Sequence, residues 1–548
     1  MKIVILLFVV FWMILCALKL KYSLHMIQLV GYKSNKYIEW INNNKNKIHT
    51  KYDKIYISNL IIFSVFLLFK YSSEYIFGYS LMYLINIIIL LVINVWLEFW
   101  SKYDVKKPLV FTGRAKRLFG ITLLLVLIDL ISTTILVLLI TKNLILYFIL
   151  FAGLLSIIYY FSSYYIIAAN YIAKPIENKI NNKFYSAASR KIREMKNITS
   201  IGITGSYGKT STKFITATIL NEKYKVLNTP ESYNTPMGIS KVINNDLNGE
   251  YDIFIAELGA TQIGDIKEVA ELSNPTIGII TSIGPCHLET FKSIDNIMRT
   301  KYELIEELPD NGIAIFNYDN DYVKKLGDKT FKEKILYGID NIEDTDVFAT
   351  DIKVSNKGST FTLCVSGLGN IECKTKLLGR HNILNILAGV ATAKVLGLSL
   401  EEISKGISKI KNIEHRLQLI DPGTGVIVID DAFNSNPDGA KTALEVIDSF
   451  NDKRKIIVTP GMVELGEVEE LENEKFGESI AKICDIAILI GERRTKPIFK
   501  GLQKHDFNMS NLYVVNSLDE ASKVLKSLTK FNDVVLFEND LPDTYNEV

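Results

Sequence analysis

Cysteine and net charge are both scarce in this sequence, and each shortage excludes a class of protein. Five cysteines are scattered over 548 residues, and none forms a CxxC pair. Their odd number and their spacing argue against a disulfide framework and favour a reducing compartment. The formal net charge is only +2, so no overall charge indicates nucleic acid as a partner. The sequence also lacks internal repeats and low-complexity tracts.

Apolar residues are abundant, and they are concentrated in the first 170 positions. The mean hydropathy of +0.18 is high for a chain of this length, which suffices for about three or four domains. A membrane-spanning helix needs about 20 mostly apolar residues. The stretches that meet this requirement, five in all, are residues 3–20, 57–73, 80–98, 118–140 and 144–170.

The orientation of these stretches follows from the basic residues around them. The first could also be a signal peptide, but no small-residue cleavage site follows it, and Lys19 and Lys21 close it. Basic residues are frequent in segments 21–56 and 101–117, whereas the other loops hold almost none. Basic loops face the cytoplasm, so five spans place the N-terminus outside. We therefore expect a multi-pass bacterial cell-membrane protein whose residues after about 172 are cytoplasmic.

Two polar features lie in or near the apolar stretches. Asp129 falls inside the fourth stretch, where a carboxyl group is costly and by default marks a functional site. The alternative is a protonated or hydrogen-bonded Asp129 that faces Ser132, Thr133 or Thr134 at a helix contact. After the last stretch, residues 173–197 are polar and basic, with apolar residues at helical spacing. This pattern predicts a linker helix that lies along or leaves the inner membrane face.

From residue 198 the pattern changes to short apolar strands that alternate with helical segments. Such alternation is typical of a parallel α/β sheet. Residues 346–377 alternate about an Asn-Lys-Gly turn and predict a small antiparallel meander. A second α/β series after residue 413 predicts a separate Rossmann-like unit. The predicted chain is thus multi-domain, with a helical transmembrane region (1–172), a linker helix (173–197), a central α/β domain (198–412) and a C-terminal α/β domain (413–548).

A phosphate-binding loop is the strongest local pattern. Residues 202–212, GITGSYGKTST, follow a predicted strand and open a predicted helix, so backbone N–H groups would point at an anion. The common P-loop has glycine where this chain has Ile203, and the match is to the shorter form G-x-x-G-K-T. Lys209 would reach the β- and γ-phosphates of ATP, and Thr210 would hold Mg²⁺; an ordinary glycine turn is the alternative. The predicted phosphate-binding residues are Gly205, Ser206, Gly208, Lys209, Thr210 and Ser211.

This loop and several later segments resemble the Mur ligases in their order and spacing. Within that family, the strings ELGA…GDI, IGPCHLETF and DDAFNSNPD are most similar to the MurF type, which adds D-Ala-D-Ala to a UDP-muramoyl peptide. The resemblance implies a P-loop central Mur ligase domain that binds ATP and a Rossmann-like C-terminal Mur ligase domain. The segments that carry it after the loop are residues 256–272, 281–304, 377–397, 414–418 and 428–444.

The resemblance also implies the chemistry of an ATP-dependent acid–amino-acid ligase that forms ADP. Because a carboxylate does not react directly with an amine, such an enzyme first transfers the γ-phosphoryl group of ATP to the carboxylate. The amine then attacks the resulting acyl phosphate. Catalysis is mainly positioning and charge neutralisation around the phosphoryl group, for which two Mg²⁺ ions are suited.

By resemblance, the magnesium ligands are Thr210, Glu257 and His287. Lys301 matches the lysine that these ligases carbamylate with CO₂, and the carbamate would support the second ion. Asn234 matches the asparagine near the transferred phosphate. A surface glutamate, a loop histidine and a solvated lysine are the plain alternatives. The catalytic set that the resemblance implies is Lys209, Asn234, His287 and Lys301.

The remaining site residues lie further along the chain. By resemblance, Asn382 and Asn385 would face the adenine. Arg416 would reach the phosphates or the ribose, and Asp431 would lie at the ribose or on the hinge side. A turn rich in Asn and Pro is a fair competing interpretation of the loop after Asp431. That loop is lined by Asn434, Ser435 and Asn436.

Three regions depart from the MurF pattern. Apolar helices stand where a soluble domain usually holds the UDP-sugar. Gly238-Ile239-Ser240 replaces a Gly-x-Pro, and residues 537–543 replace a Lys-Gly-Ser after the last strand. The first and last of these are substrate-recognition regions, so the resemblance implies ATP-dependent ligation more strongly than it implies particular substrates.

Three functions stay open on the sequence. The first is addition of D-Ala-D-Ala or a related amine to a peptidoglycan precursor at the inner membrane face, with cell-wall synthesis proteins as possible partners. The second is the same chemistry on another acid, such as a γ-linked polyglutamate-type polymer or a lipid-linked acceptor, with an amino acid or dipeptide as the amine. The third is a membrane scaffold with a retired ATPase. The intact residues that argue against a scaffold are Lys209, Thr210, Glu257, His287 and Lys301.

Overall fold

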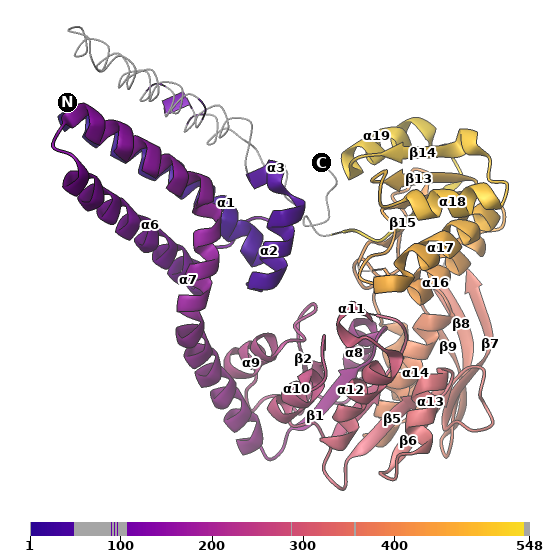
Figure 1. The fold of residues 1–548 in the computed structure, drawn as a ribbon. Coiled ribbons are helices and arrows are strands. Elements are labelled where there is room, and N and C mark those ends of the chain that lie inside the picture. Colours follow the sequence, from indigo (N-terminus) through magenta and orange to yellow (C-terminus); the bar gives the residue numbers. More distant parts are fainter. Residues whose placement is uncertain are drawn as a thin grey trace. The chain divides into compact units, whose positions relative to one another are not determined.

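Two compact units make up the described part of the chain, one up to residue 180 and one from residue 181 to residue 541. Each unit has its own apolar cores, so the two are described separately (Figure 1). The computed structural model describes residues 2–48, 107–286, 288–355, 358–433 and 435–541, together with Ser58, Ile89, Val92, Ile93 and Trp96.

The first unit consists of helices, of which the three longest are apolar. The helices are α1 (Lys2–Leu29), α2 (Ser34–Asn43), α3 (Lys45–Ile48), α6 (Gly113–Ile140) and the first part of α7 (Leu144–Glu194). One buried cluster contains Phe8 and Trp12 of α1, Val126 of α6 and Leu155 of α7. The indole N–H of Trp12 donates to the main-chain carbonyl oxygen of Leu155 at 3.0 Å. The cluster therefore joins the three longest helices described here.

Three helices in the described ranges are long and apolar enough to cross a membrane, judged by length and composition alone. They overlap the first, fourth and fifth predicted stretches. The other two, residues 57–73 and 80–98, lie where the structure describes only isolated residues, so the five-span topology stays a prediction. Helix α1 runs to Leu29, past Lys19 and Lys21, which were expected to close it. The apolar helical segments are Phe8–Leu29, Gly113–Ile140 and Ile149–Glu194.

Asp129 of α6 contacts a partner on another helix. The hydroxyl of Tyr165 in α7 donates to the Asp129 carboxylate. Ser132 donates only to the main-chain carbonyl oxygen of Asp129, at 3.0 Å. The predicted hydrogen-bonded carboxyl group at a helix contact is therefore confirmed, but its partner is Tyr165, whereas Ser132 and Thr134 donate to main-chain carbonyl oxygens. The partner lies more than 30 positions further along the chain, where no local pattern reveals it.

Helix α7 is unbroken from Leu144 to Glu194, with Pro175 inside it. The linker helix predicted at residues 173–197 is helical as far as Glu194, where it forms the last part of this one long helix. Its place along or away from a membrane face stays a prediction. From residue 181 the helix belongs to the second unit, where Ala188 and Ile192 are buried in a core. Side chains of this part donate to main-chain carbonyl oxygens at 2.9–3.2 Å, in the pairs Tyr185–Glu268, Lys191–Asn244 and Arg193–Glu271.

A nine-stranded sheet forms the centre of the second unit. Its strands are β1 (Thr199–Thr204), β2 (Val226–Asn228), β3 (Ile253–Glu257), β4 (Ile277–Ile280), β5 (Ile313–Asn317), β6 (Lys334–Gly338), β7 (Val347–Ser355), β8 (Gly358–Val365) and β9 (Gly369–Thr375). The order is β2-β3-β1-β4-β5-β6-β7-β8-β9. Strands β2 to β7 run parallel, and β7, β8 and β9 form the predicted antiparallel meander as an extension of the same sheet.

Helices cover both faces of this sheet (Figure 1). They are α8 (Lys209–Leu220), α9 (Pro236–Asn245), α10 (Asp265–Ser273), α11 (Leu288–Phe291), α12 (Ile294–Glu306), α13 (Asp321–Asp328), α14 (Arg380–Val395) and α15 (Leu400–Ser408). One core contains residues of α8, α14 and α15, and the other contains residues of α7, α9, α10, α12 and α13. Strand β1 is buried along nearly its whole length, as a central parallel strand must be.

A six-stranded sheet follows in the C-terminal part of the second unit, as predicted for a separate α/β series. Its order is β10-β11-β15-β12-β13-β14, and only β10 is antiparallel to its neighbour. The strands are β10 (Gln418–Ile420), β11 (Ile427–Asp431), β12 (Arg454–Thr459), β13 (Ile486–Ile490), β14 (Leu512–Val515) and β15 (Asp533–Glu538). The helices are α16 (Pro437–Asp448), η1 (Gly466–Val468), α17 (Glu469–Ile483), α18 (Lys496–Lys504), η2 (Met509–Asn511) and α19 (Leu518–Leu528).

Candidate active site

The predicted phosphate loop lies between the end of β1 and the start of α8. Gly208 has a φ of +78°, a left-handed conformation that glycine adopts at little cost. A Cβ atom at this position would lie 2.7 Å from the side-chain oxygen of Asn385. The backbone N–H of Ser206 donates to the carbonyl oxygen of Ser282 at 2.6 Å. The loop is therefore tightly held, and it leads into a helix N-terminus, the geometry that binds phosphate groups.

Lys209 folds back over this loop. Its ammonium group donates to the carbonyl oxygens of Gly205 and Ser206, at 2.7 and 3.0 Å. Burial lowers the pKa of Lys209, and the nearby carboxylate of Glu257 opposes that shift. The hydroxyl of Thr210, one residue further, has no hydrogen-bond partner among the described residues. Both side chains are thus placed at the loop with capacity for a phosphate group or a metal ion.

The loop after β4 supports the phosphate loop from the side. The hydroxyl of Thr281 donates to the carbonyl oxygens of Thr204 and Tyr207. Two asparagines, one at the end of β5 and one just after it, hold this second loop in turn. Asn317 donates to the carbonyl oxygen of Thr281 at 2.8 Å, and Asn320 donates to that of Ile283 at 3.0 Å. Polar contacts therefore run from the end of β5 to the phosphate loop.

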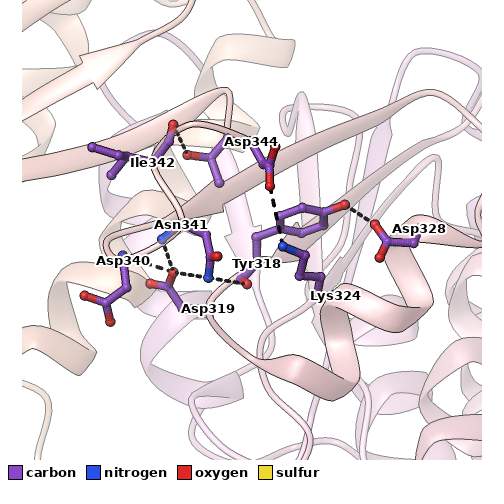
Figure 2. A network of polar contacts seen from close by, with 9 residues as sticks. Tyr318, Asp319, Lys324, Asp328, Asp340, Asn341, Ile342 and Asp344 are labelled. Atoms are coloured by element: carbon purple, nitrogen blue, oxygen red, sulfur yellow. Dashed lines mark hydrogen bonds and ion pairs between the residues drawn. The ribbon is translucent and has the colours of Figure 1, made fainter.

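Asp319 fixes the loop that carries these asparagines, and Figure 2 shows its surroundings. Its carboxylate accepts backbone N–H groups of Ile339, Asp340 and Asn341, at 2.6, 3.1 and 3.0 Å. The side-chain amide of Asn341 also donates to the carbonyl oxygen of Tyr318, at 3.0 Å. Charge-assisted bonds of this kind are stronger than neutral ones. The β5–α13 loop is therefore a rigid support for the site.

Glu257 ends β3 and is only 1% exposed. The side-chain amide of Asn234 donates to one of its carboxylate oxygens at 3.1 Å, so two predicted site residues are brought together. The ammonium group of Lys213 lies 3.1 Å from the other oxygen. Lys213 was not predicted from the sequence. The available signal was its place one helical turn after Lys209, which puts both lysines on one face of α8.

Lys301 lies on α12 and is 2% exposed. No hydrogen bond or ion pair engages its ammonium group within the part of the chain that the structure describes; the nearest recorded contact is the ring of Phe291, at 5.9 Å. Burial lowers the pKa of Lys301 to about 7, and the charge of Lys209 adds to the shift. A fraction of this buried amine is therefore neutral near physiological pH. His287, predicted to lie near it, falls outside the described residues.

Asn382 and Asn385 lie side by side on α14. Asn382 is buried, and its amide donates to the carbonyl oxygen of Leu378 at 2.9 Å. Asn385 accepts a hydrogen bond from the hydroxyl of Thr212 in α8, at 3.1 Å. These contacts join α14 to the helix of the phosphate loop. The predicted contact of both asparagines with adenine stays a prediction.

Arg416 lies in the connector between the two sheets and donates to the carbonyl oxygen of Phe433 at 3.1 Å. Its neighbours His415 and Leu417 have φ angles of +57° and +45°, which are unusual for residues with bulky side chains. Burial lowers the pKa of Arg416, whereas the carboxylates of Asp431 and Glu257 oppose the shift. Arg416 is therefore within electrostatic range of the nine-stranded-sheet domain.

Asp431 ends β11, and its carboxylate accepts the backbone N–H of Leu417 at 3.1 Å. It thus holds the connector that carries Arg416. Ser435 donates to Glu538, and its backbone N–H donates to the side chain of Asn539 at 3.2 Å. Among the other loop residues, Asn436 caps α16 and Asn434 falls outside the described residues.

The oxygen donors of the site fit Mg²⁺ when phosphate is present. The hydroxyl of Thr210 and the carboxylate of Glu257 are hard oxygen ligands of the kind that Mg²⁺ prefers. The described residues contain no group of three or more Asp, Glu, His and Cys side chains that could hold a metal ion. Mg²⁺ is usually bound by one or two carboxylates together with substrate phosphates, and this donor set agrees with that pattern.

A glycine loop between a buried parallel strand and a helix N-terminus, followed by Lys-Thr, defines a P-loop α/β protein. A family model of the Mur ligase middle domain matches residues 203–393, and a model of the Mur ligase, glutamate ligase domain matches residues 415–538. The chain belongs to the Mur ligase family.

Relatives within this family include ligases of the MurF type. The chain is 34% identical over 289 residues to the UDP-N-acetylmuramoyl-tripeptide–D-alanyl-D-alanine ligase of Buchnera aphidicola subsp. Baizongia pistaciae. This match covers 53% of this chain and 62% of that protein. The ligase of the same name from Buchnera aphidicola subsp. Acyrthosiphon pisum is 30% identical over 341 residues, 61% of this chain and 74% of that one. The chain thus spans less than two thirds of the first relative.

A solved structure gives the same picture of the fold. The MurF ligase of Thermotoga maritima in complex with ADP matches with a TM-score of 0.59 and 25% sequence identity. The match covers 66% of this chain and 80% of that chain. The matched family segments begin at residue 203, so the likeness rests on the second unit.

Proposed function

We propose that this protein is an ATP-dependent, ADP-forming ligase of the MurF type. It adds D-Ala-D-Ala or a related amine to the carboxyl group of a peptidoglycan precursor. The apolar helices of the first unit hold it at the inner membrane face. The observation that carries the proposal is the convergence of Lys209, Asn234, Glu257 and Lys301 around one phosphate loop, with Arg416 of the next domain in electrostatic range.

The reaction has two steps. A carboxylate oxygen of the acid attacks the γ-phosphorus of ATP, the bond to the β–γ bridging oxygen breaks, and ADP leaves. The amine then attacks the acyl phosphate, an amide bond forms, and inorganic phosphate leaves with release of a proton. The cationic side chains of Lys209 and Arg416 would neutralise charge on the phosphoryl group, and Asn234 would orient it. Such positioning and charge stabilisation account for most of the catalysis in phosphoryl transfer.

Mg²⁺ fits the site as a partner of the phosphate oxygens, where it would supply further charge neutralisation. Thr210 and Glu257 would hold one ion, and His287 with a modified Lys301 would hold a second. Lys301 supports this assignment because a carbamate forms when a neutral amine attacks CO₂ and loses a proton. A buried lysine whose ammonium group makes no hydrogen bond or ion pair in the described part of the chain, and whose pKa is about 7, is suited to that attack.

A second candidate is the same chemistry with a different acid or amine, such as a lipid-linked acceptor or a γ-linked polyglutamate-type polymer. It is favoured by the first unit, whose helices are long and apolar enough to lie in a membrane. It is also favoured by the end of β15, where Glu538 and Asn539 stand in place of the expected Lys-Gly-Ser. Both are buried and hydrogen-bonded within the C-terminal sheet domain.

The test uses the full chain, purified in detergent with ATP and Mg²⁺. The acid is UDP-N-acetylmuramoyl-tripeptide and the amine is D-Ala-D-Ala. Mass spectrometry should detect the amide product together with ADP. Lys209→Ala should abolish both, whereas Lys223→Ala, at an exposed lysine just after α8, should leave them unchanged. A different product from a membrane extract would favour the second candidate. If no acid and amine pair leads to ADP, the chain is not a ligase, and the interpretation as a membrane scaffold with a retired ATPase is favoured.

A further inference from the structure

Lys213 is a fully buried lysine whose position the ligase reaction does not by itself explain. Its side chain is 0% exposed, and that of its partner Glu257 is 2% exposed. The ammonium group lies 3.1 Å from a Glu257 oxygen and also donates to the main-chain carbonyl oxygen of Glu231. A buried charge is retained only when it is paired, so this ion pair is a fixed feature of the site.

We propose that Lys213 keeps divalent cations away from Glu257 until a polyphosphate anion has entered the phosphate loop. In the free protein, the ammonium group occupies the side of the carboxylate that a metal ion would use. The site therefore binds a polyphosphate first and gains a divalent cation with it. This inference rests on the proposed function, in which the polyphosphate is the triphosphate chain of ATP.

The contacts of Glu257 support this order of binding. One carboxylate oxygen accepts from Asn234 and the other contacts Lys213, both at 3.1 Å, so both oxygens are engaged. Mg²⁺ binds carboxylate oxygens at about 2.0–2.1 Å and loses its water reluctantly. An ion at the second oxygen would lie next to the ammonium group, in a buried place where like charges repel strongly. A metal ion alone must therefore compete with a tethered cation.

The charges around Glu257 also favour the binding of an anion before a cation. Lys209 and Arg416 also lie within electrostatic range of this carboxylate, so three cations surround Glu257, although Lys213 also interacts with Glu231 and Arg416 also interacts with Asp431 and Glu538. Such a site attracts anions. Once a polyphosphate is bound, its negative charges reverse the local sign, and a divalent cation becomes favourable at Glu257.

A purely structural role for Lys213 makes a different prediction. The ammonium group also anchors Glu231, which has a φ of +42°, and thereby holds the loop that carries Asn234. If anchoring were its whole role, loss of the charge would lower stability and leave the affinity for metal ions unchanged. The binding of a metal ion to the protein without nucleotide therefore distinguishes the two roles.

The experiment titrates the nucleotide-free full chain with Mn²⁺ in detergent and counts bound ions by electron paramagnetic resonance. Wild type should bind no Mn²⁺ at this site until inorganic tripolyphosphate is added, and then one or two ions. Lys213→Met should bind Mn²⁺ without tripolyphosphate at least tenfold more tightly than wild type. The added substitution Glu257→Gln should remove that gain. Lys241→Met, at an exposed lysine, is the matched control and should behave as wild type.

Two results would overturn the inference. The first is a folded Lys213→Met protein whose Mn²⁺ affinity equals that of wild type. The second is stoichiometric Mn²⁺ binding by wild type without tripolyphosphate, lost in Glu257→Gln. The second result requires no Lys213 variant, so the inference stays testable even if Lys213→Met does not fold. Failure of the proposed function would look different, because no acid and amine pair would then lead to ADP, whatever the Mn²⁺ titration shows.

Discussion

Asp431 and Glu538 lie directly opposite each other in the parallel ladder between β11 and β15, at the carboxyl ends of both strands. Burial raises the pKa of Asp431 to about 6, against the attraction of Arg416. Burial and the carboxylate of Asp431 together raise the pKa of Glu538 well above its ordinary value. Two adjacent buried carboxyl groups do not both ionise readily, so this pair holds a proton near neutral pH.

The first prediction concerns the stability of this pair. Because both pKa values are higher in the folded protein than in an unfolded chain, the folded state binds more protons between about pH 4 and the folded values. The contribution of this pair to the free energy of unfolding is therefore fully present below about pH 4 and is lost as the pH rises through the folded pKa values. Glu538→Gln keeps the shape and cannot ionise, so it should gain about 1–2 kcal/mol relative to wild type by pH 8.

Thermal unfolding midpoints between pH 5 and pH 8 measure this effect. The midpoint of Glu538→Gln should fall less with pH than that of wild type. Glu467→Gln, at an exposed glutamate, serves as the control and should follow wild type. Parallel curves for wild type and Glu538→Gln would mean that the pair ionises without cost, and the prediction would be wrong.

A second prediction concerns Lys301. Protein incubated with ¹³C-bicarbonate should show a carbamate signal by nuclear magnetic resonance near neutral pH. The signal should weaken below about pH 7, because the pKa of Lys301 is about 7 and only the neutral amine attacks CO₂. Lys301→Ala should lack the signal and lose about a hundredfold or more of the ligase rate. Lys292→Ala, at an exposed lysine before α12, should keep both. An unchanged signal in Lys301→Ala would assign the carbamate elsewhere.

The sequence predicted the parts of the candidate site that are contiguous or end a strand. The phosphate loop is a single segment with a characteristic order of glycine, lysine and threonine, so Lys209 and Thr210 could be found without a structure. Glu257 could be found because it closes an apolar strand. The antiparallel meander and the second α/β series were confirmed for the same reason, since their strands repeat a clear pattern.

Contacts between distant segments could not be predicted in this way. Lys213 follows three hydroxyl residues and looks like a solvated helix position. Only the placement of β3 beside β1 brings Glu257 to it. The partner of Asp129 was missed because Tyr165 lies on another helix. Strands β2 and β6 are short and carry polar residues, so their pattern did not stand out from that of loops.

A third prediction follows from helix α7. A chain that lacks residues 1–172 keeps the part of α7 that packs on the nine-stranded-sheet domain, so it should fold and bind ATP. A chain that lacks residues 1–197 also loses Ala188 and Ile192 from a core. Burying an isoleucine contributes about 1.5–3 kcal/mol, and further hydrogen bonds are lost as well. The shorter chain should therefore unfold at a lower temperature, as scanning calorimetry would measure.

The longer of these two chains also tests the role of the first unit. If the acid acceptor is membrane-bound, removal of residues 1–172 should leave ATP affinity unchanged while turnover on a membrane extract falls. Full turnover on that extract by the truncated chain would count against a role of the first unit in substrate access. Equal melting temperatures for both truncations would instead contradict the docking of α7 as a structural contribution.

A final prediction tests the closeness of Asn234 and Glu257. Gly259 follows β3, its backbone N–H donates to the carbonyl oxygen of Asn234 at 2.9 Å, and a Cβ atom there would lie 2.7 Å from the Asn234 side chain. Gly259→Ala must therefore displace Asn234, which then loses its hydrogen bond to Glu257. Overpacking of this kind costs about 1–3 kcal/mol of stability. The rate of ADP formation should fall at least tenfold, because phosphoryl transfer depends on fixed positioning.

The control is Gly249→Ala, where an added Cβ meets nothing within 4 Å, and it should leave both the stability and the rate of ADP formation unchanged. A Gly259→Ala enzyme with a normal rate would show that Asn234 need not stay beside Glu257 for catalysis.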